Sequence, residues 1–278
     1  MTDHIAGKTI VVTGAGSGFG RLVAEGTAVR GAKLVCGDVN LDAVETVVAG
    51  IRAAGGDALA VHADVTRLGD VRALVAAAVD TYGAIDVMIN NAGTMPLAFI
   101  ADHEAAYEAW DRCIDINFKG VLNGIVAAFD PMMRQGRGHV INLSSIYGNH
   151  PVVGAAVYGA TKSAVNFMSE SLRVEGRGKI KVTVIKPTGV PVTGLTATVV
   201  NRDAGIGILG QNMGAFTDMV TQMHAGTFPA DRLDADNVDY ASLAPRYIAE
   251  AIIHAIDQPW GVAIAELTVR AAGDHFII

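Results

Sequence analysis

Short apolar runs alternate with longer segments of helical pattern along most of the chain. The short runs are rich in β-branched residues and cover residues 8–13, 33–38, 57–64, 85–90, 139–144, 181–187 and 262–269. Such runs predict β-strands, and the Ala-, Leu- and Val-rich segments between them have the length of helices. Strands that are apolar on both faces and separated by helices are typical of a parallel sheet that helices cover on both sides. We therefore predict an α/β fold with a doubly wound, Rossmann-type parallel sheet.

The alternation stops after Pro187. Residues 188–243 contain seven glycines and three of the nine methionines, and they show little strand character before a helical pattern resumes at 248–256. A long irregular segment inside a compact domain usually covers a site. We interpret residues 188–243 as a substrate lid, inserted after the sixth strand of a single domain that spans residues 1–278. A surface excursion or a subunit contact is the alternative.

Composition and charge argue against several classes of ligand. A chain of 278 residues with 51% apolar and 18% charged residues can bury one substantial core. Its 28 acidic and 21 basic residues form no long run of one sign, so we expect no nucleic-acid partner. Cys36, Cys113 and the eight scattered histidines lack the spacing of metal ligands, so we expect no metal.

The start of the chain and its apolar runs predict a cytoplasmic protein. Asp3 and His4 stand where a secretory signal carries basic residues. Glycines or charged residues interrupt every apolar run before it reaches the roughly 20 residues that cross a bilayer. We therefore expect neither export nor a membrane partner, and a reducing compartment in which both cysteines stay thiols.

A glycine-rich turn connects the first predicted strand to a helical pattern that begins near Arg21. Its residues are Thr13, Gly14, Ala15, Gly16, Ser17, Gly18, Phe19 and Gly20. Glycines leave room for a tight turn and for the close approach of a pyrophosphate, while the helix N-terminus presents free N–H groups to the phosphates. A strand before these glycines and a helix after them are the setting of a dinucleotide site.

Asp38 ends the second predicted strand, eighteen residues after Gly20. A dinucleotide fold places a carboxylate there to accept hydrogen bonds from the adenosine ribose hydroxyls. A 2′-phosphate would meet that negative charge, and neither Ser17 nor Val39 could neutralise it. Asp38 therefore favours NAD over NADP. A surface carboxylate that caps the next helix is the alternative, although Asn40 is the better placed cap.

These motifs resemble those of the short-chain dehydrogenase/reductase family in order and spacing, from Lys8 to Pro187. The glycine-rich turn is similar to the family's TGxxxGxG signature, and residues 90–93 resemble its NNAG turn. Asp64 and Val65 resemble the pair that contacts the adenine, and Asn117 resembles a helix asparagine of the family. The family also has a YxxxK motif, here residues 158–162, and cofactor contacts after its sixth strand, here residues 187–190. The resemblance thus implies cofactor contacts from Gly14, Ser17, Gly18, Phe19, Gly20, Asp38, Asp64, Val65, Asn91, Ala92, Gly93, Tyr158, Lys162, Pro187, Thr188, Gly189 and Val190.

Tyr158 and Lys162 match the family's YxxxK motif, and Ser145 lies thirteen residues before Tyr158 at the end of a predicted strand. Residues four apart share one helical face, so the Lys162 ammonium should lie near the phenol. With the positive nicotinamide, it should lower the phenol's pKa from its usual value of about 10. The resemblance implies that Tyr158 exchanges a proton with the substrate and that Ser145 positions the substrate oxygen. It also implies that Lys162 binds the nicotinamide ribose and that Asn117 anchors a water that connects Lys162 to solvent.

The run after the sixth predicted strand departs from the family's pattern. The family has Pro-Gly followed shortly by a threonine, whereas this sequence has Thr188 between Pro187 and Gly189 and a later Thr193 that is displaced accordingly. Val190 and Thr193 are candidate nicotinamide contacts, and Thr188 could take over either role.

Substrate contacts are expected from loops near the catalytic residues, because pockets in this family are built from variable loops. The candidates are Met95, Tyr147, Asn149, His150 and Met213, with Pro96, Met219 and Met223 as further ones. Thioethers adapt to irregular shapes, so a methionine-lined pocket would suit a bulky apolar alcohol. Core packing explains the same methionines almost as well.

The sequence thus predicts an NAD-dependent oxidoreductase that transfers a hydride between the cofactor and a small-molecule secondary alcohol or ketone of apolar character. An NADPH-dependent carbonyl reductase and a non-catalytic NAD-binding sensor or scaffold are the alternatives. The complete set of Ser145, Tyr158 and Lys162 favours an enzyme. The resemblance also implies a homodimer or homotetramer.

Overall fold

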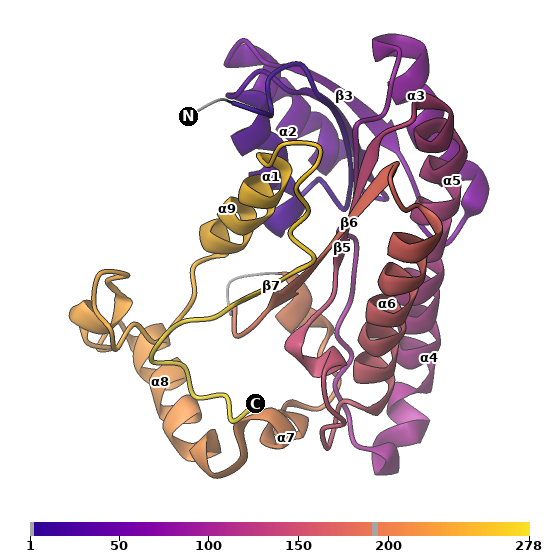
Figure 1. The fold of residues 1–278 in the computed structure, drawn as a ribbon. Helices are drawn as coiled ribbons and strands as arrows, with labels where there is room; N and C mark the ends of the chain where they lie inside the picture. The colour runs from indigo at the N-terminus through magenta and orange to yellow at the C-terminus, as the bar shows by residue number, and fades with distance from the viewer. Residues whose placement is uncertain (1–2, 191–193) are drawn as a thin grey trace.

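The computed structural model, which describes residues 3–190 and 194–278, contains a seven-stranded sheet with the order β3-β2-β1-β4-β5-β6-β7 (Figure 1). The strands are β1 (Thr9–Thr13), β2 (Lys33–Asp38), β3 (Asp57–His62), β4 (Val87–Asn90), β5 (Gly138–Leu143), β6 (Ile180–Pro187) and β7 (Glu266–Val269). Every pair of neighbouring strands is parallel. The predicted doubly wound α/β fold is therefore confirmed.

Helices cover both faces of the sheet (Figure 1). One face carries α1 (Gly18–Ala28), α2 (Leu41–Ala53) and α9 (Pro245–Ile256), and the other carries α3 (Leu68–Tyr82), α5 (Gly120–Gln135) and α6 (Ala156–Glu175). Successive strand residues point to opposite faces of the sheet. Val12 therefore packs in the core beneath α1, α2 and α9, and Val11 packs in the core beneath α3, α5 and α6. Within residues 3–190 and 194–278, no helix is long and apolar enough to span a membrane.

The position of the site follows from the order of the strands. The chain leaves β1 toward β2 and β3 on one side, and then returns to β4 on the other side of β1. The connections therefore diverge at the carboxyl ends of β1 and β4, which opens a crevice where ligands bind in sheets of this kind. The glycine-rich turn, residues 13–20, begins at this point.

Residues 194–243 are more regular than the sequence pattern indicates. They include short 3-10 turns and the helices α7 (Ile206–Leu209) and α8 (Met213–Ala225), which lie beyond the carboxyl ends of the strands (Figure 1). The expectation of an irregular segment is therefore wrong for α8. The structure describes α8 in full, and Met219 is its one buried residue, while no side chain caps its start. The helix thus lacks both the apolar stripe and the cap that make a helix readable in a sequence.

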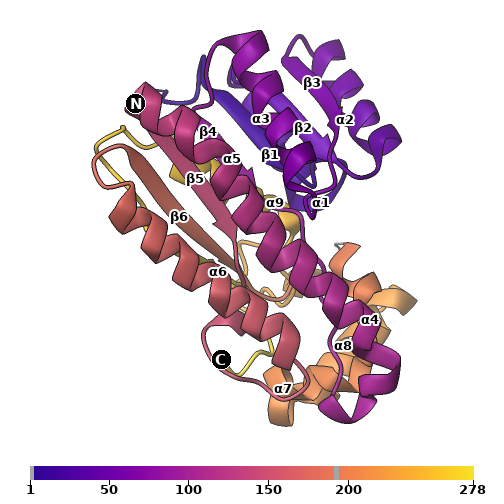
Figure 2. The ribbon, with the colours of Figure 1, turned by 90° about the vertical axis from the view of Figure 1, so that its right-hand side faces the viewer.

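β7 forms the edge of the sheet beside β6, although it is shorter than the predicted strand over 262–269. The chain then runs back across the carboxyl ends of the strands, and Figure 2 shows the C-terminus beside α7. There the backbone N–H of Ile277 donates a hydrogen bond to the carbonyl of Ile208 at 3.0 Å. Residues 270–278 therefore belong to the same region as α7 and α8.

Candidate active site

The turn after β1 has the shape that a dinucleotide phosphate requires. Gly14 and Gly18 have φ values of 65° and 54°, in the region that glycine adopts without strain. A Cβ on Gly20 would overlap the carbonyl oxygen of Gly14 and would lie 2.6 Å from Asn91 Nδ2. Because α1 begins at Gly18, its first backbone N–H groups are free to bind an anion at the turn. The turn is therefore a cradle that depends on its glycines.

Thr13 and Asn91 join this turn to the loop after β4. Asn91 Nδ2 donates hydrogen bonds to the carbonyls of Thr13 at 2.9 Å and Gly14 at 3.1 Å. The backbone N–H of Asn91 donates to Thr13 Oγ1 at 3.0 Å. The NNAG segment thus supports the glycine turn from the side of β4, and Ala92 and Gly93 line the crevice beyond it.

Asp38 lies at the end of β2, on the other side of the glycine turn. Its Oδ2 accepts a hydrogen bond from the backbone N–H of Gly16, and its Oδ1 accepts one from that of Asn40, both at 2.9 Å. The side chain of Asn40 caps α2 by accepting a hydrogen bond from the backbone N–H of Ala43. Asp38 is therefore free of the capping role and lines the crevice beside Val39.

Asp64 and Val65 follow β3 and form the same end of the crevice. Asp64 Oδ1 accepts hydrogen bonds from the backbone N–H and the hydroxyl of Thr66, at 3.0 and 2.8 Å. Burial raises the pKa of Asp64, but these bonds and the charges of Arg67 and Arg112 outweigh burial and lower the pKa below its usual value. Asp64 is therefore held as a carboxylate.

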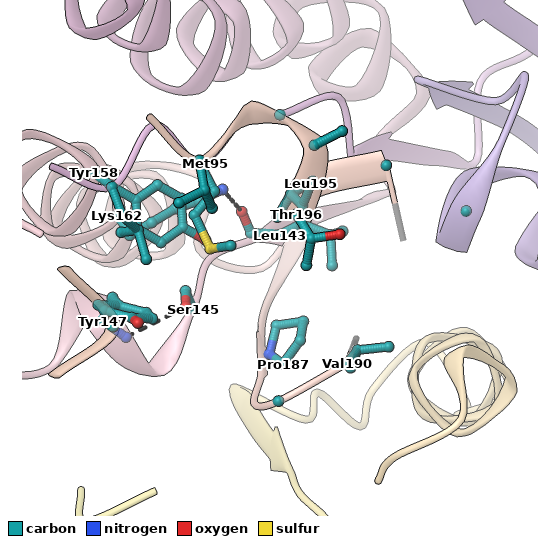
Figure 3. A pocket seen from close by; sticks show the side chains of 18 of the residues that line it. Met95, Leu143, Ser145, Tyr147, Tyr158, Lys162, Pro187, Val190, Leu195 and Thr196 are labelled. Carbon is teal, nitrogen blue, oxygen red and sulfur yellow. Dashed lines mark hydrogen bonds between the residues drawn. The ribbon is translucent and has the colours of Figure 1, made fainter. Parts of the chain in front are cut away.

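Ser145, Tyr158 and Lys162 meet where β5 ends and α6 begins (Figure 3). Tyr158 and Lys162 lie one turn apart on α6, and both are buried. Lys162 Nζ is 5.8 Å from the centre of the Tyr158 ring and donates a hydrogen bond of 2.8 Å to the carbonyl of Leu143. Ser144 Oγ donates to the carbonyl of Lys162 at 3.2 Å, which ties α6 to the end of β5.

Burial controls the charges of these side chains. It raises the pKa of Tyr158, and a hydrogen bond with the Ser145 side chain only partly offsets the effect. Burial also lowers the pKa of Lys162 to about 8. In the chain by itself the pKa of Tyr158 is therefore raised, because a phenolate in this buried place loses its hydration. The predicted lowering by Lys162 together with a bound nicotinamide stays a prediction.

Asn117 lies in a π-helical segment, Ile114–Lys119, which joins α4 (His103–Cys113) to α5. Its buried side chain spans the backbone of Thr94: Oδ1 accepts a hydrogen bond from Thr94 N–H at 2.9 Å, and Nδ2 donates to the Thr94 carbonyl at 2.8 Å. The side chain therefore fixes the loop after the NNAG turn. Its predicted role in anchoring a water stays a prediction.

The run after β6, in which Thr188 separates Pro187 from Gly189, passes beside Val269 and Phe276. The backbone N–H of Thr188 donates to the carbonyl of Val269 at 3.1 Å, and the buried Thr188 hydroxyl has no hydrogen-bond partner within the described chain. Gly189 has a φ of 60°, and the ring of Phe276 fills the space of a Cβ at Gly189. Residues 187–190 all line the cleft. Thr193 lies outside the described residues.

These elements surround a cleft of approximately 1490 Å³ that extends from the end of β2 to α8. The predicted cofactor residues that line it near β1, β2, β3 and β4 are Gly14, Ser17, Gly18, Phe19, Asp38, Asp64, Val65, Asn91, Ala92 and Gly93. Gly20 does not line the cleft, because it lies beneath the turn and allows the turn to pack on α1. In the described part of the chain, no group of three or more His, Cys, Asp or Glu side chains could hold a metal ion.

Apolar side chains line the end of the cleft near α7 and α8. Met95, Tyr147 and Met213 are among them, and the Tyr147 ring packs edge-on against Tyr158 with ring centres 5.4 Å apart. Asn149 and His150 do not line the cleft. They follow the 3-10 turn Ile146–Gly148, which leads the chain to the surface, and both side chains are exposed. The prediction that these two residues contact substrate is therefore corrected. Of the further candidates, Met219 lines the cleft, whereas Pro96 and Met223 do not.

The sequence reasoning missed one wall of the cleft. Phe216 of α8 and the pair His275 and Phe276 line it, together with Leu195, Val199, Ile208, Leu209, Ala241 and Ser242. No motif marks these residues. The one available signal was the apolar run 276–278 after the last strand.

Comparison with known proteins identifies the family. Residues 8–204 match the family model for short chain dehydrogenases. The chain belongs to the short-chain dehydrogenase family. An uncharacterized oxidoreductase of Listeria monocytogenes is 35% identical over 271 residues, which are 95% of this chain and 96% of that protein. A 2,5-dichloro-2,5-cyclohexadiene-1,4-diol dehydrogenase of Sphingobium indicum is 40% identical over 198 residues, which are 69% of this chain and 78% of that protein.

Two solved structures resemble this short-chain dehydrogenase along most of its length. An alcohol dehydrogenase from Thermococcus sibiricus, complexed with 5-hydroxy-NADP, has a TM-score of 0.76 at 21% identity and covers 96% of this chain and 97% of its own. A short chain dehydrogenase/reductase from Burkholderia phymatum, in complex with NAD, has a TM-score of 0.75 at 27% identity and covers 96% of this chain and 90% of its own. The predicted family and fold are therefore confirmed, and the chain is an oxidoreductase with a nicotinamide-binding fold.

Proposed function

We propose that this oxidoreductase transfers a hydride between NAD and a secondary alcohol, or the matching ketone, of apolar character. The main support is that Ser145, Tyr158 and Lys162 line the same cleft as the glycine turn. A buried lysine beside a buried tyrosine is costly to the folded state, and a protein that only senses a cofactor has no chemical need for the pair. Perturbed side chains in a cleft are typical of an active site.

The residues of the crevice fit a nicotinamide dinucleotide. The turn leaves the first backbone N–H groups of α1 free for the pyrophosphate, and Gly14 and Gly18, which line the cleft, place no side chain there. At the other end, the hydroxyl of Thr188 is a buried polar group without a partner in the described residues, and a carboxamide would satisfy it. A bound, oxidised nicotinamide supplies the hydride acceptor and a positive charge near Tyr158.

Tyr158 is the residue that exchanges the substrate proton in this proposal. Ser145 holds the substrate oxygen beside the phenol, so the oxygen's proton passes over a short distance to Tyr158 during oxidation and returns from it during reduction. Burial disfavours the phenolate, so positive charge close to the ring is required. Lys162, whose pKa is about 8, is largely charged at neutral pH and provides part of that charge.

The choice of NAD depends on Asp38. Its carboxylate lines the crevice and is fixed by two backbone N–H groups, so it can accept hydrogen bonds from ribose hydroxyls without moving. None of residues 36–40 is basic. A 2′-phosphate in this place would face an unscreened negative charge, which favours NAD over NADP.

The substrate end of the cleft supports an apolar alcohol. Its lining includes Met95, Leu97, Leu195, Val199, Ile208, Leu209, Met213 and Phe216. Burying apolar area against these side chains contributes about 25 cal/mol per Å². The similar Sphingobium protein is named for a cyclic diol, and we propose a cyclic or branched secondary alcohol for this chain. We also propose that residues 188–243, of which 188–190 and 194–243 are described, act as the lid.

Self-association is part of the proposal. Phe167 and Val174 on α6 are 77% and 62% exposed, and Leu122 and Val126 on α5 are exposed as well. Exposed apolar side chains on neighbouring helices are typical of a subunit interface. A homodimer or homotetramer would bury them. Light scattering of the purified protein gives its molar mass and so the number of subunits.

The decisive test of the function is the Tyr158→Phe variant. Wild type should form NADH from NAD and an apolar secondary alcohol, while the variant should lose activity by at least about a hundredfold, the usual scale of general acid–base catalysis. Its NADH affinity should stay close to that of wild type, as measured by fluorescence titration. Tyr107→Phe, which alters an exposed tyrosine of α4, is the matched control. Substantial activity in Tyr158→Phe would move the chemistry elsewhere.

A further inference from the structure

The segment after β7 forms part of the cleft wall and is held there by its own contacts. Arg270 pairs with the Asp274 carboxylate through Nε at 2.9 Å and Nη2 at 2.6 Å, and Nη2 also donates to the carbonyl of Phe276 at 3.0 Å. A bidentate arginine–carboxylate pair has a fixed geometry. Residues 270–278 are therefore a folded turn.

This turn contacts α7 on one side and the run after β6 on the other; Figure 1 shows the C-terminus beside α7. On the side of α7, Ile277 N–H donates to the Ile208 carbonyl at 3.0 Å, and Asn212 Nδ2 donates to the carbonyl of His275 at 2.9 Å. On the side of β6, the phenylalanine that follows His275 packs on Gly189. The backbone of His275 is thus fixed between the proposed lid and the run that ends β6.

The imidazole of His275 is one of the polar groups in a largely apolar wall. It lines the cleft and lies edge-on to Phe216, with ring centres 6.2 Å apart. Its Nδ1 is enclosed, and neither ring nitrogen has a hydrogen-bond partner within residues 3–190 and 194–278. An enclosed polar atom without a partner destabilises the folded chain. Such a side chain is therefore poorly explained as a packing residue.

The enclosure of Nδ1 indicates where the ring carries its proton. An enclosed N–H donor without an acceptor is rarer than an enclosed lone pair without a donor. The neutral imidazole therefore favours the tautomer with its proton on Nε2. In the described structure Nε2 is not among the enclosed atoms. His275 therefore carries an N–H donor that is not enclosed, on a side chain that lines the cleft.

We propose that His275 recognises the substrate by donating a hydrogen bond from Nε2 to an acceptor oxygen remote from the reacting carbon. The preferred substrates are then apolar secondary alcohols that carry one further ether, carbonyl, ester or hydroxyl oxygen. This inference rests on the proposed function, because it places the reacting carbon at Tyr158. Tyr158 and Phe276, the neighbour of His275, belong to one apolar cluster, and all three residues line the same cleft. A substrate held at Tyr158 can therefore extend along apolar side chains toward His275.

The test is an oxygen scan of an apolar alcohol. The parent is 2-nonanol, and in each analogue one methylene beyond the carbinol carbon and its neighbour is replaced by an ether oxygen, which accepts hydrogen bonds but donates none. In wild type, the analogue whose oxygen reaches His275 should match or exceed 2-nonanol in kcat/KM. In His275→Phe, which keeps an aromatic ring without the donor, that analogue should lose roughly tenfold through KM, the loss expected for one hydrogen bond. The kcat/KM for 2-nonanol should change by less than about threefold, a difference smaller than one hydrogen bond supplies.

His275→Gln is the matched control, because its amide N–H can stand in for Nε2–H. It should retain most of the selectivity for the favoured analogue. An equal loss for every alcohol in His275→Phe, or no selective loss at any oxygen position, would overturn the proposal. So would a proton on Nδ1 in ¹⁵N NMR spectra of the His275 ring.

Failure of the proposed function gives a different result. If wild type oxidises neither these alcohols nor cyclic and branched secondary alcohols, the proposed function is wrong, and the role of His275 is then measured from binding alone. The same pairs of ligands are compared by their thermal stabilisation of the wild-type and His275→Phe proteins saturated with NAD. Selective loss of binding of an ether analogue in His275→Phe supports the inference, and identical stabilisation of both proteins by every ligand overturns it.

Discussion

The ammonium group of Lys162 donates a hydrogen bond of 2.8 Å to the carbonyl oxygen of Leu143, the last residue of β5. This contact joins the face of α6 that carries Tyr158 to the strand that leads to Ser145. The acceptor is neutral, so it does not compensate for the hydration that the buried ammonium has lost. The lowered pKa of Lys162 is the consequence.

That lowered pKa predicts a dependence of stability on pH. The pKa of Lys162 is about 8 in the folded chain against 10.5 for an ordinary lysine. Below pH 8 both states carry the proton, and the folded state bears the full cost of the buried charge. As the pH rises from 8 toward 10.5, the folded state releases its proton first, so the contribution of Lys162 to the free energy of unfolding increases.

We therefore expect the free energy of unfolding of wild type, minus that of Lys162→Met, to rise by on the order of 2 kcal/mol between pH 7 and pH 10. Urea unfolding at several pH values measures this difference, in which the ionisation of other groups largely cancels. Lys179→Met, at an exposed position, is the control. A difference that does not vary with pH would show that the lysine is not desolvated.

Gly20→Ala should disrupt the glycine turn. The added Cβ would overlap the Gly14 carbonyl and approach Asn91 Nδ2, so we expect a loss of about 2 kcal/mol or more in the free energy of unfolding and weaker NADH binding. Gly50→Ala is the matched control, because a Cβ at this exposed position in α2 meets nothing within 4 Å. It should raise stability by up to about 1 kcal/mol. Equal effects of the two variants would contradict the overlap.

Asp38→Asn should change cofactor preference. The amide removes the negative charge but keeps one acceptor oxygen, so we expect NADPH to bind roughly tenfold more tightly than in wild type, and NADH more weakly. Fluorescence titration with both reduced cofactors gives the ratio. Asp42→Asn, at an exposed position in the first turn of α2, should leave the ratio unchanged. Tighter binding of NADPH than NADH by wild type would favour the carbonyl-reductase alternative.

Asn117→Ala should destabilise the loop beside Lys162. It removes both hydrogen bonds to the backbone of Thr94 inside a buried site, and we expect a cost of about 2–3 kcal/mol together with a reduced kcat. The comparison variant is Asn123→Ala, which removes one hydrogen bond from a partly buried side chain to the carbonyl of Val65. It should cost about 1 kcal/mol in the free energy of unfolding. If Asn117→Ala lost stability but kept full kcat, Asn117 would have a structural role only.

The sequence predicted those features that depend on neighbouring residues. Each strand was readable because its β-branched residues are contiguous, and Tyr158 and Lys162 were readable as a pair because a spacing of four places both on one helical face. The glycine turn was readable because its conformation depends on residues within the turn itself. These local rules covered the fold, the glycine cradle and the three residues at the end of β5 and the start of α6.

The features that depend on distant contacts were not readable. α8 carries no strong apolar stripe, and His275 reaches the cleft through contacts with α7 and Asn212, far earlier in the chain. The pKa of Tyr158 depends on burial that Tyr147 and other segments create together. Asn149 and His150 were predicted to lie in the pocket because they are close in sequence to Ser145. The 3-10 turn Ile146–Gly148, which separates them from Ser145, leads the chain to the surface instead.

The position of residues 270–278 has a practical consequence for anyone who expresses this protein. A purification tag or reporter fused after Ile278 would begin beside α7, close in sequence to His275 and Phe276 of the cleft wall, and would compete with the turn that Arg270 holds in place. At the opposite end of the molecule, Asp3 pairs with Arg30, away from the cleft. We therefore expect a fusion at the N-terminus to disturb the cleft less than a fusion after Ile278.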